Sequence, residues 1–319
     1  MDSKDGEVKF RLNLAALVIA YLRPENLKTI LVSLDKNNVQ MIYVAVDYPK
    51  NLTVEHIRIH EQVMKVIADF RKTFTGSFFI KVNDMNLGCA VSVITACNWF
   101  FENVDYGLIL EDDCIPTADF ILLAENARSL FIKNTDIWFV CGTQHAPKSL
   151  IANWSISNYP LNWGWCTTSK AWNDIYFSLR KQNLKIDKKN RPDLTLAEIS
   201  YWNAGARRAY EGRVDVWDTI VVQKMQALRK FAILPRVSLV SNVGFDKHST
   251  NTKYESRWMH NETGKFEDVN VEPISSNILS DWLRLNFFKI SNRHLLSTKL
   301  TRLLDIVKRN NINPLLKRI

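Results

Sequence analysis

Three adjacent carboxylates, Glu111, Asp112 and Asp113, directly follow a short apolar run at residues 106–110. A run of this length predicts a buried strand, and open α/β sheets hold their ligands at the carboxyl ends of strands. Adjacent carboxylates repel one another, and Mg²⁺ or Mn²⁺ relieves that repulsion because such hard cations prefer oxygen ligands. The segment therefore predicts a metal site that binds a phosphorylated substrate. The alternative is an acidic turn before a helix that starts near Thr117.

A further carboxylate, Asp218, follows Trp217 near the start of a helix predicted over residues 215–228. The helix dipole stabilises a negative charge at this position, and one carboxylate is sufficient as the general base of a direct displacement. Asp218 is therefore the candidate base, and Glu211 and Asp215 are the nearby alternatives. The other interpretation is that Asp218 only caps its helix.

Strand and helix patterns alternate through the first half of the chain. Strands are predicted at residues 14–20, 40–46, 78–82 and 106–110, and helices at residues 24–34, 53–74 and 89–103. This order predicts an α/β fold with a Rossmann-like, mostly parallel sheet and helices on both faces. The second half predicts a strand at residues 136–141, a Trp-rich loop at 153–172, an exposed charged loop at 181–193 and a strand at 231–241.

The charge of the chain is concentrated at its end. Of the net charge of +9, residues 281–319 contribute +7, because they hold nine Lys or Arg and two Asp. A nearly neutral globule with a basic tail argues against a nucleic-acid-binding protein. Residues 271–319 carry apolar residues at helical spacing between the basic ones, which predicts an amphipathic helix on an anionic membrane surface. The alternative is a helix that packs on the domain or on a second subunit.

The cysteines and the apolar runs indicate a cellular compartment. The five cysteines form no Cys-x-x-Cys pair and lie in or beside apolar segments, so free buried thiols in a reducing compartment are expected. No apolar run approaches the ~18 residues of a membrane span. We expect a cytoplasmic protein, which the basic tail would hold peripherally on the inner face of the membrane.

Taken in order, residues 12–250 resemble the A-type-fold (GT-A) glycosyltransferases, which use nucleotide sugars. Glu111-Asp112-Asp113 resembles the acidic metal motif of that family, and the resemblance implies that Asp113 ligates the cation that bridges the diphosphate. Many relatives have Asp-x-Asp where this chain has Glu-Asp-Asp, so the role of Asp112 stays open. Glu111 and Asp112 are carried over as donor-binding residues.

The resemblance also implies contacts with the nucleotide. Tyr21 and Arg23 follow the first strand, where the family contacts the base and ribose, and Asp47 ends the second strand as a base-binding acid. Asn86 and Gly88 belong to a short loop that resembles the one approaching the nucleotide. Arg23 either pairs with a phosphate or caps the strand-to-helix turn. Tyr21 either stacks on the base or lies in the core.

The acidic triplet is also similar to that of the type I N-acetylglucosaminyltransferases, which place a catalytic aspartate after a tryptophan, as in Trp217-Asp218. The Trp163-Gly164-Trp165 stretch resembles their Gly-Trp loop. The tryptophans of residues 153–172 are expected to divide between the core and an acceptor platform, for which Trp163 and Trp165 are the candidates, with Trp165 expected to face a sugar ring. The surrounding sequence resembles bacterial surface-polysaccharide glycosyltransferases. Residues 173–213 match no motif.

A late polar loop, residues 242–252, contains Lys247 and His248. In some A-type enzymes a late histidine completes the metal shell or touches the diphosphate, and a flexible loop can close over the donor. The resemblance therefore makes His248 a candidate metal ligand. Lys247 can neutralise phosphate as a point charge. The alternative is a histidine that is only solvated.

The sequence thus predicts a metal-dependent, inverting hexosyl- or N-acetylhexosaminyltransferase of bacterial surface-polysaccharide assembly. Its expected partners are Mn²⁺ or Mg²⁺, a nucleotide diphosphate sugar and a glycan or lipid-linked oligosaccharide acceptor. The catalytic domain is expected at residues 1–270, with the nucleotide-sugar half at 12–120 and the acceptor half at 136–250. One alternative is a non-catalytic nucleotide-sugar or membrane-binding module of a glycan-assembly complex. The other is a sugar nucleotidylyltransferase, whose glycine-rich phosphate loop is missing after the first strand.

Overall fold

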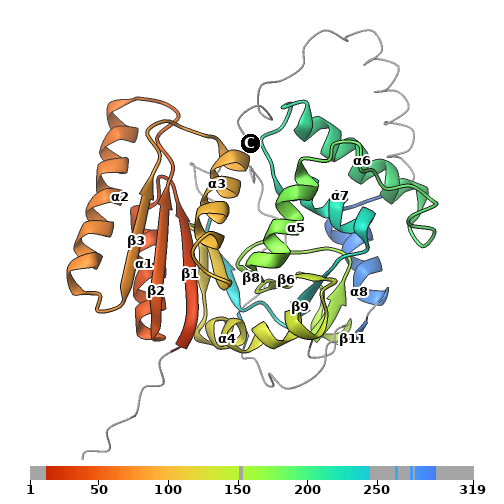
Figure 1. Ribbon diagram of the computed structural model, residues 1–319, viewed down its shortest axis with the longest axis horizontal. Coiled ribbons are helices and arrows are strands. Elements are labelled where there is room, and N and C mark those ends of the chain that lie inside the picture. Colours follow the sequence, from red (N-terminus) through yellow and green to blue (C-terminus); the bar gives the residue numbers. More distant parts are fainter. Residues whose placement is uncertain (1–11, 151–153, 245–262, 265–273, 276, 292–319) are drawn as a thin grey trace, which may run out of the picture.

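A computed structural model describes residues 12–150, 154–244, 263–264, 274–275 and 277–291 (Figure 1). Its main sheet contains β1 (Leu12–Ala20), β2 (Val39–Val46), β3 (Ser77–Val82), β4 (Tyr106–Glu111), β6 (Ile137–Cys141), β7 (Trp154–Ser157), β8 (Trp165–Thr168), β9 (Phe231–Pro235) and β11 (Ile274–Ser275). The strand order is β11-β7-β9-β6-β8-β4-β1-β2-β3. A separate antiparallel pair joins β5 (Cys114–Pro116) to β10 (Val240–Asn242).

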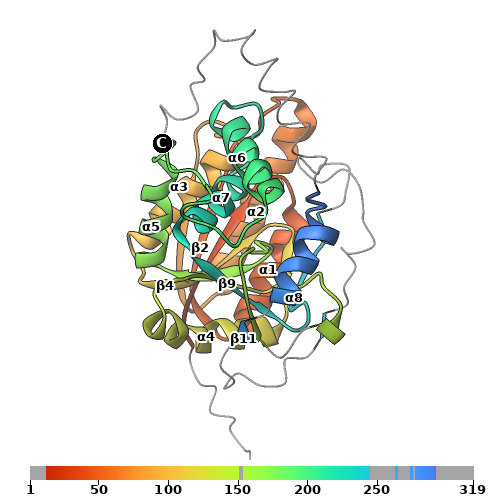
Figure 2. The same ribbon diagram turned by 90° about the vertical axis from the view of Figure 1, so that its right-hand side faces the viewer.

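Helices cover both faces of the main sheet. They are α1 (Pro24–Lys36), α2 (Val54–Thr73), α3 (Cys89–Phe101), α4 (Ala118–Lys133), α5 (Ser169–Leu179), α6 (Leu196–Tyr210), α7 (Asp218–Leu228) and α8 (Asn277–Trp282), with the 3₁₀ turn η1 (Lys148–Leu150) and the π-helical turn η2 (Leu283–Phe287). Figure 2 looks onto the side of the molecule that carries α6, α7 and α8. The predicted α/β class, with a mostly parallel sheet, is confirmed.

The alternation of side chains along β1 divides the core into two layers. Leu14, Ala16 and Val18 face the layer that contains side chains of α1, α2 and α4, whereas Leu17 and Ile19 face the layer that contains side chains of α3, α5 and α7. Successive residues of a strand point to opposite faces, and a parallel strand covered on both sides is therefore apolar throughout. This explains why the first half of the fold follows from the sequence pattern.

Two predictions for the second half are wrong in detail. Residues 153–172, predicted as a loop, contain β7, β8 and the start of α5, because their tryptophans pack inward: Trp154, Trp165 and Trp172 are at most 2% exposed. Residues 231–241 are not one strand, because the chain turns after Pro235 and delivers β10 to the second sheet. Strands of four residues, such as β7 and β8, are too short to show a recognisable alternation of apolar and polar residues in the sequence.

The described part of the predicted tail packs against the domain. Leu279, Leu283 and Ile290 are at most 1% exposed and belong to the same core layer as α5 and α7. Over residues 277–291 the segment therefore forms part of the domain. Residues 292–319 lie outside the described residues, and membrane attachment through them stays a prediction. In the described ranges, no helix is both long and apolar enough to cross a bilayer.

Candidate active site

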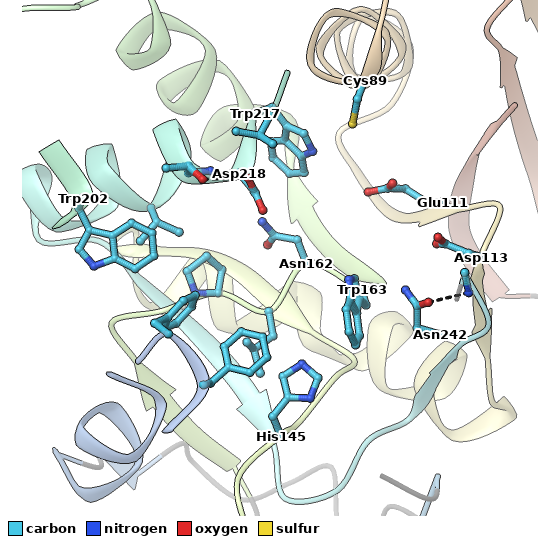
Figure 3. A pocket seen from close by; sticks show the side chains of 18 of the residues that line it. Cys89, Glu111, Asp113, His145, Asn162, Trp163, Trp202, Trp217, Asp218 and Asn242 are labelled. Carbon is cyan, nitrogen blue, oxygen red and sulfur yellow. Dashed lines mark hydrogen bonds between the residues drawn. The ribbon is translucent and has the colours of Figure 1, made fainter. Parts of the chain in front are cut away.

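The carboxyl ends of β1 and β4, which carry candidate site residues, lie at one pocket of about 360 Å³. Strands β1 and β4 are parallel neighbours with Ile19 paired to Glu111, so both chains leave the sheet at the same level. Glu111 and Asp113 lie on one wall of the pocket and Asp218 on another (Figure 3). A volume of this size is typical of small-molecule sites.

Asp112 turns away from this pocket into the protein. Its residue is 3% exposed, and its carboxylate accepts hydrogen bonds from the backbone N–H of Tyr21 and from Arg23 Nη1, each at 2.7 Å. Burial raises the pKa of Asp112 to about 6, although the neighbouring guanidinium of Arg23 opposes that rise. Asp112 therefore fixes the loop between β1 and α1, which is a positioning role that the sequence left open.

Arg23 places a cation beside the acidic wall. Its Nη1 lies 2.7 Å from Asp112 Oδ1 and 3.5 Å from Asp113 Oδ2, and the residue lines the pocket. Its side chain makes no capping hydrogen bond to α1. Of the two roles considered for Arg23, pairing with a substrate phosphate agrees with this position, since the guanidinium is already held at the pocket wall.

Glu111 and Asp113 are the two carboxylates on the acidic wall of the pocket. Burial raises the pKa of Glu111 to about 8, with further contributions from the charges of Asp113, Asp112 and Asp218. A bound divalent cation would remove this unfavourable charge concentration. In the part of the chain that the structure describes, no group of three His, Cys, Asp or Glu forms a metal shell. Carboxylates such as Glu111 and Asp113 are oxygen ligands of the kind that Mg²⁺ prefers, and Mg²⁺ is commonly bound by one or two carboxylates together with substrate phosphates.

The strand β10 and the residues after it pack directly on Asp113. The backbone N–H of Val243 donates to the Asp113 carbonyl at 2.9 Å, and the N–H of Gly244 donates to Asn242 Oδ1 at 2.8 Å (Figure 3). A Cβ at Gly244 would collide with the Asp113 side chain, so a larger residue there would displace that carboxylate. The loop thus reaches the acidic wall, but Lys247 and His248 lie outside the described residues and their roles stay predictions.

Asp218 begins α7 and points into the pocket beside Trp217 and Asn162 (Figure 3). Its Oδ1 accepts a hydrogen bond from the N–H of Thr219 at 2.6 Å. Although Asp218 is open to solvent in the pocket, desolvation by the pocket walls raises its pKa. A carboxylate with a raised pKa in a substrate-sized pocket is a candidate general base.

The two alternative bases are held in other interactions. The carboxylate of Asp215 accepts hydrogen bonds from the N–H groups of Cys89 and Ala90 at 2.7 and 2.9 Å. Glu211 forms an ion pair with Arg213 at 3.0 Å. Neither acid lines the pocket. Asp215 thus caps a helix that is distant in sequence, which leaves Asp218 as the base that the geometry favours.

Asp215→Ala is expected to lower the free energy of unfolding by about 1–2 kcal/mol, because it leaves two N–H groups at the start of α3 without their cap. Urea unfolding followed by circular dichroism measures the change. Asp174→Ala, at an exposed aspartate of α5, serves as the control and is expected to have little effect. Equal stability of the two variants would show that water replaces the Asp215 cap.

Asp47 supports the loop before α3 rather than the pocket. Its buried carboxylate accepts hydrogen bonds from Asn83 Nδ2 at 2.9 Å, Asn86 Nδ2 at 3.1 Å and the N–H of Leu87 at 3.1 Å. Desolvation raises the pKa of Asp47 despite these bonds. The loop then ends at Gly88, whose φ of +79° favours glycine. These residues and Tyr21 do not line the pocket, so their nucleotide contacts stay predictions.

The two candidate acceptor tryptophans separate in the structure. Trp163 is half-buried and lines the pocket, whereas Trp165 is 1% exposed. The Trp165 ring packs against Phe139, Trp172 and Trp217 at centroid distances of 5.0, 6.1 and 5.7 Å. Its faces are therefore used by the core, and the expectation that Trp165 faces a sugar ring is corrected.

Several pocket residues were not found from the sequence. They are His145, Asn162, Tyr201, Trp202, Phe287 and Phe288. The His145 ring stacks on Phe287 at a centroid distance of 4.4 Å and meets Trp163 edge-on at 5.0 Å. These contacts join segments far apart in the chain, and no local pattern marks any of them.

No family model and no curated protein matches this chain. Among solved structures, it is similar to an apo UDP-glucose pyrophosphorylase, at 9% identity and a TM-score of 0.37, over 70% of this chain and 90% of that one. It is also similar to the inositol-1-phosphate CTP transferase of T. maritima, at 10% identity and a TM-score of 0.36, over 71% and 86%. These names suit the nucleotidylyltransferase alternative better than the glycosyltransferase. At such scores the similarity carries no argument about activity.

Proposed function

We propose that this protein is a metal-dependent, inverting glycosyltransferase. It moves a sugar from a nucleotide diphosphate sugar to a glycan or lipid-linked acceptor, in bacterial surface-polysaccharide assembly. The observation that supports this proposal is a single pocket with Glu111, Asp113 and Arg23 on one wall and Asp218 on another. Such an arrangement separates a phosphate-binding side from a base, as a group transfer between two substrates requires.

The acidic wall suits the leaving group. Glu111 and Asp113 would hold Mn²⁺ or Mg²⁺ together with the diphosphate, and the bound cation would supply charge stabilisation to the departing phosphate oxygens. Arg23 adds a fixed positive charge on the same wall, where Asp112 holds its guanidinium. A guanidinium suits a phosphate because it presents donors in a planar fork.

The opposite wall suits the acceptor. The Asp218 carboxylate takes the proton from an acceptor hydroxyl, whose oxygen attacks the anomeric carbon as the bond from that carbon to the diphosphate breaks. Attack from the side opposite the diphosphate inverts the anomeric configuration. Neither Asp215 nor Glu211 lines the pocket, so Asp218 is the one carboxylate among the described lining residues besides Glu111 and Asp113.

A sugar nucleotidylyltransferase is the second candidate, because the same acidic wall would also suit a nucleoside triphosphate. The turn after β1 reads Tyr-Leu-Arg-Pro and lacks the glycines of a phosphate loop, and this reaction would give Asp218 no role. A non-catalytic nucleotide-sugar module is the third, and it would tolerate loss of the pocket acids.

Product analysis separates these candidates. Thermal shifts with uridine, guanosine, cytidine and thymidine diphosphates and their sugar conjugates, with and without Mn²⁺, identify the donor. A glycosyltransferase is expected to release nucleoside diphosphate from that donor, faster with acceptor present. Formation of nucleoside triphosphate and sugar 1-phosphate from the donor and pyrophosphate would instead establish the nucleotidylyltransferase. Binding without either product would support the non-catalytic module.

A further inference from the structure

The pocket has a second end whose chemistry differs from that of the acidic wall. Tyr201, Trp202, Phe287 and Phe288 line it, and Figure 3 places Trp202 on the side of Asp218 away from Cys89, with Trp163 between Trp202 and Asn242. Among the described lining residues the only Lys or Arg is Arg23, which lies at the acidic wall. This aromatic end is therefore apolar and without a permanent positive charge.

The segment after α8 supplies one wall of the aromatic end. Phe288 meets Trp202 edge-on at a centroid distance of 5.0 Å and Tyr159 at 5.2 Å, while Phe287 stacks on His145 at 4.4 Å. Both phenylalanines are half-buried, so part of each ring stays open to the pocket. The rings are held from behind and present their remaining surface to a ligand.

The same segment is anchored to α6. Leu283 and Ile290 are buried on either side of the two phenylalanines, and Arg284 Nε lies 3.8 Å from Glu198 Oε1. Glu198 also accepts a hydrogen bond from the Tyr159 hydroxyl at 2.6 Å. Two buried apolar anchors and an ion pair therefore fix the wall before any ligand binds, and such preorganisation increases affinity.

Polar groups border the aromatic end on the side of the base. The side chains of Asn162 and Asp218 lie near each other between the aromatic end and the acidic wall (Figure 3). A ligand that fills this space meets aromatic surface on one side and hydrogen-bonding groups at its edge. A pyranose ring has this division, since its C–H groups form an apolar face and its hydroxyls lie around the rim.

We propose that the aromatic end is the acceptor subsite and that it takes an uncharged pyranose ring. The apolar face of the ring packs on Phe287, Phe288 and Trp163, and its hydroxyls point toward Asn162 and Asp218. A phosphorylated or carboxylated sugar is disfavoured, because its charge would be desolvated with no Lys or Arg beside it among the described residues that line this end. This inference rests on the proposed glycosyltransferase function and names the acceptor class that Asp218 would serve.

Ligand-observed NMR on the full chain tests the proposal. The probes are methyl glycosides of glucose, galactose, mannose and N-acetylglucosamine, with methyl glucuronide as the charged counterpart. At least one uncharged glycoside is expected to receive saturation transfer at its ring protons, and methyl glucuronide is expected to bind more weakly. Phe287→Leu and Phe288→Leu, which keep apolar volume but lose the planar face, are expected to raise the dissociation constant by about tenfold.

Leu285→Ala is the matched control, because Leu285 lies in the same turn but is 53% exposed and does not line the pocket. It is expected to bind the glycosides like the unmodified chain, and thermal melts identify any variant that has lost its fold. Two separate phenylalanine variants keep the test decisive if one of them unfolds. Binding that neither folded variant weakens, or absence of ring-proton saturation by every glycoside, would overturn the proposal.

A competition experiment with a nucleotide distinguishes failure of the acceptor assignment from failure of the proposed glycosyltransferase function. Uridine diphosphate with Mg²⁺ is expected to leave glycoside binding intact, because the diphosphate belongs at the acidic wall. Displacement of the glycoside by the nucleotide, with weaker nucleotide binding in Phe288→Leu, would place the base in the aromatic end and overturn the acceptor assignment. Glycoside binding by a chain that processes no sugar nucleotide would refute the glycosyltransferase and retain a sugar site.

Discussion

Asp218→Asn is expected to lower turnover by ~10²-fold or more, the scale of general-base catalysis, while donor affinity stays nearly unchanged. Asparagine keeps the shape of the side chain, and its amide oxygen can still accept the hydrogen bond that Thr219 N–H donates to Asp218. The donor diphosphate belongs to the opposite wall, so its binding does not depend on the base. Acceptor-dependent release of nucleoside diphosphate measures turnover, and calorimetric titration measures donor affinity.

The pH profile of turnover provides a further readout of Asp218. A base must be deprotonated to act, and desolvation raises the pKa of Asp218. The acidic limb of the profile is therefore expected above the range of an exposed aspartate, and turnover falls as the pH drops through it. In Asp218→Asn this limb is expected to disappear together with most of the activity.

Asp174→Asn, at an exposed aspartate of α5, is the matched control for this substitution and is expected to leave turnover unchanged. A collapse of donor affinity with turnover preserved would make Asp218 a binding residue. Retention of the donor's anomeric configuration, measured by NMR of the product, would contradict direct displacement by a base at this position.

The sequence predicts those parts of the fold and site that depend on neighbouring residues. The run before Glu111 is buried on both faces of the mostly parallel sheet, so it lacks charged residues and its end is marked by the first charge. Thr53 and Thr117 likewise accept hydrogen bonds from the first turns of α2 and α4, where the helix starts were expected. In these cases the residues adjacent in sequence are sufficient to predict where the strand or helix begins or ends.

Contacts between distant segments could not be predicted in this way. Asp112 meets Arg23 across 89 positions, and Asp215 meets Cys89 across 126, so no window of sequence contains either pair. Trp163 and Trp165 have the same residue type and nearly the same neighbours, yet only Trp163 lines the pocket. Strict alternation would place both rings on one face, but β8 begins only at Trp165 and Gly164 between them has a φ of +72°, so the chain turns there.

Asp113→Ala is expected to abolish release of nucleoside diphosphate from the donor and transfer to the acceptor. The variant removes one of the two carboxylates on the acidic wall of the pocket, and the ion shared with the diphosphate would lose a ligand. A chelator is expected to reproduce the loss in the unmodified chain, and excess Mn²⁺ to restore activity there but not in the variant. Activity assays and Mn²⁺ titrations followed by electron paramagnetic resonance measure both effects.

The fold is expected to survive Asp113→Ala, because β10 is held by its pairing with β5, and the hydrogen bond from Val243 N–H uses the Asp113 backbone carbonyl. The substitution also removes a charge that raises the pKa of Glu111, so it relieves repulsion in the pocket. Asp112→Ala is the matched contrast: it removes the acceptor of the Tyr21 N–H and one of the two carboxylates beside Arg23, and it is expected to lower thermal stability. Full activity of Asp113→Ala, or of the chelated protein, would refute the metal site. If Asp113→Ala unfolds while Asp112→Ala stays stable, Asp113 is the structural acid and Asp112 the candidate metal ligand.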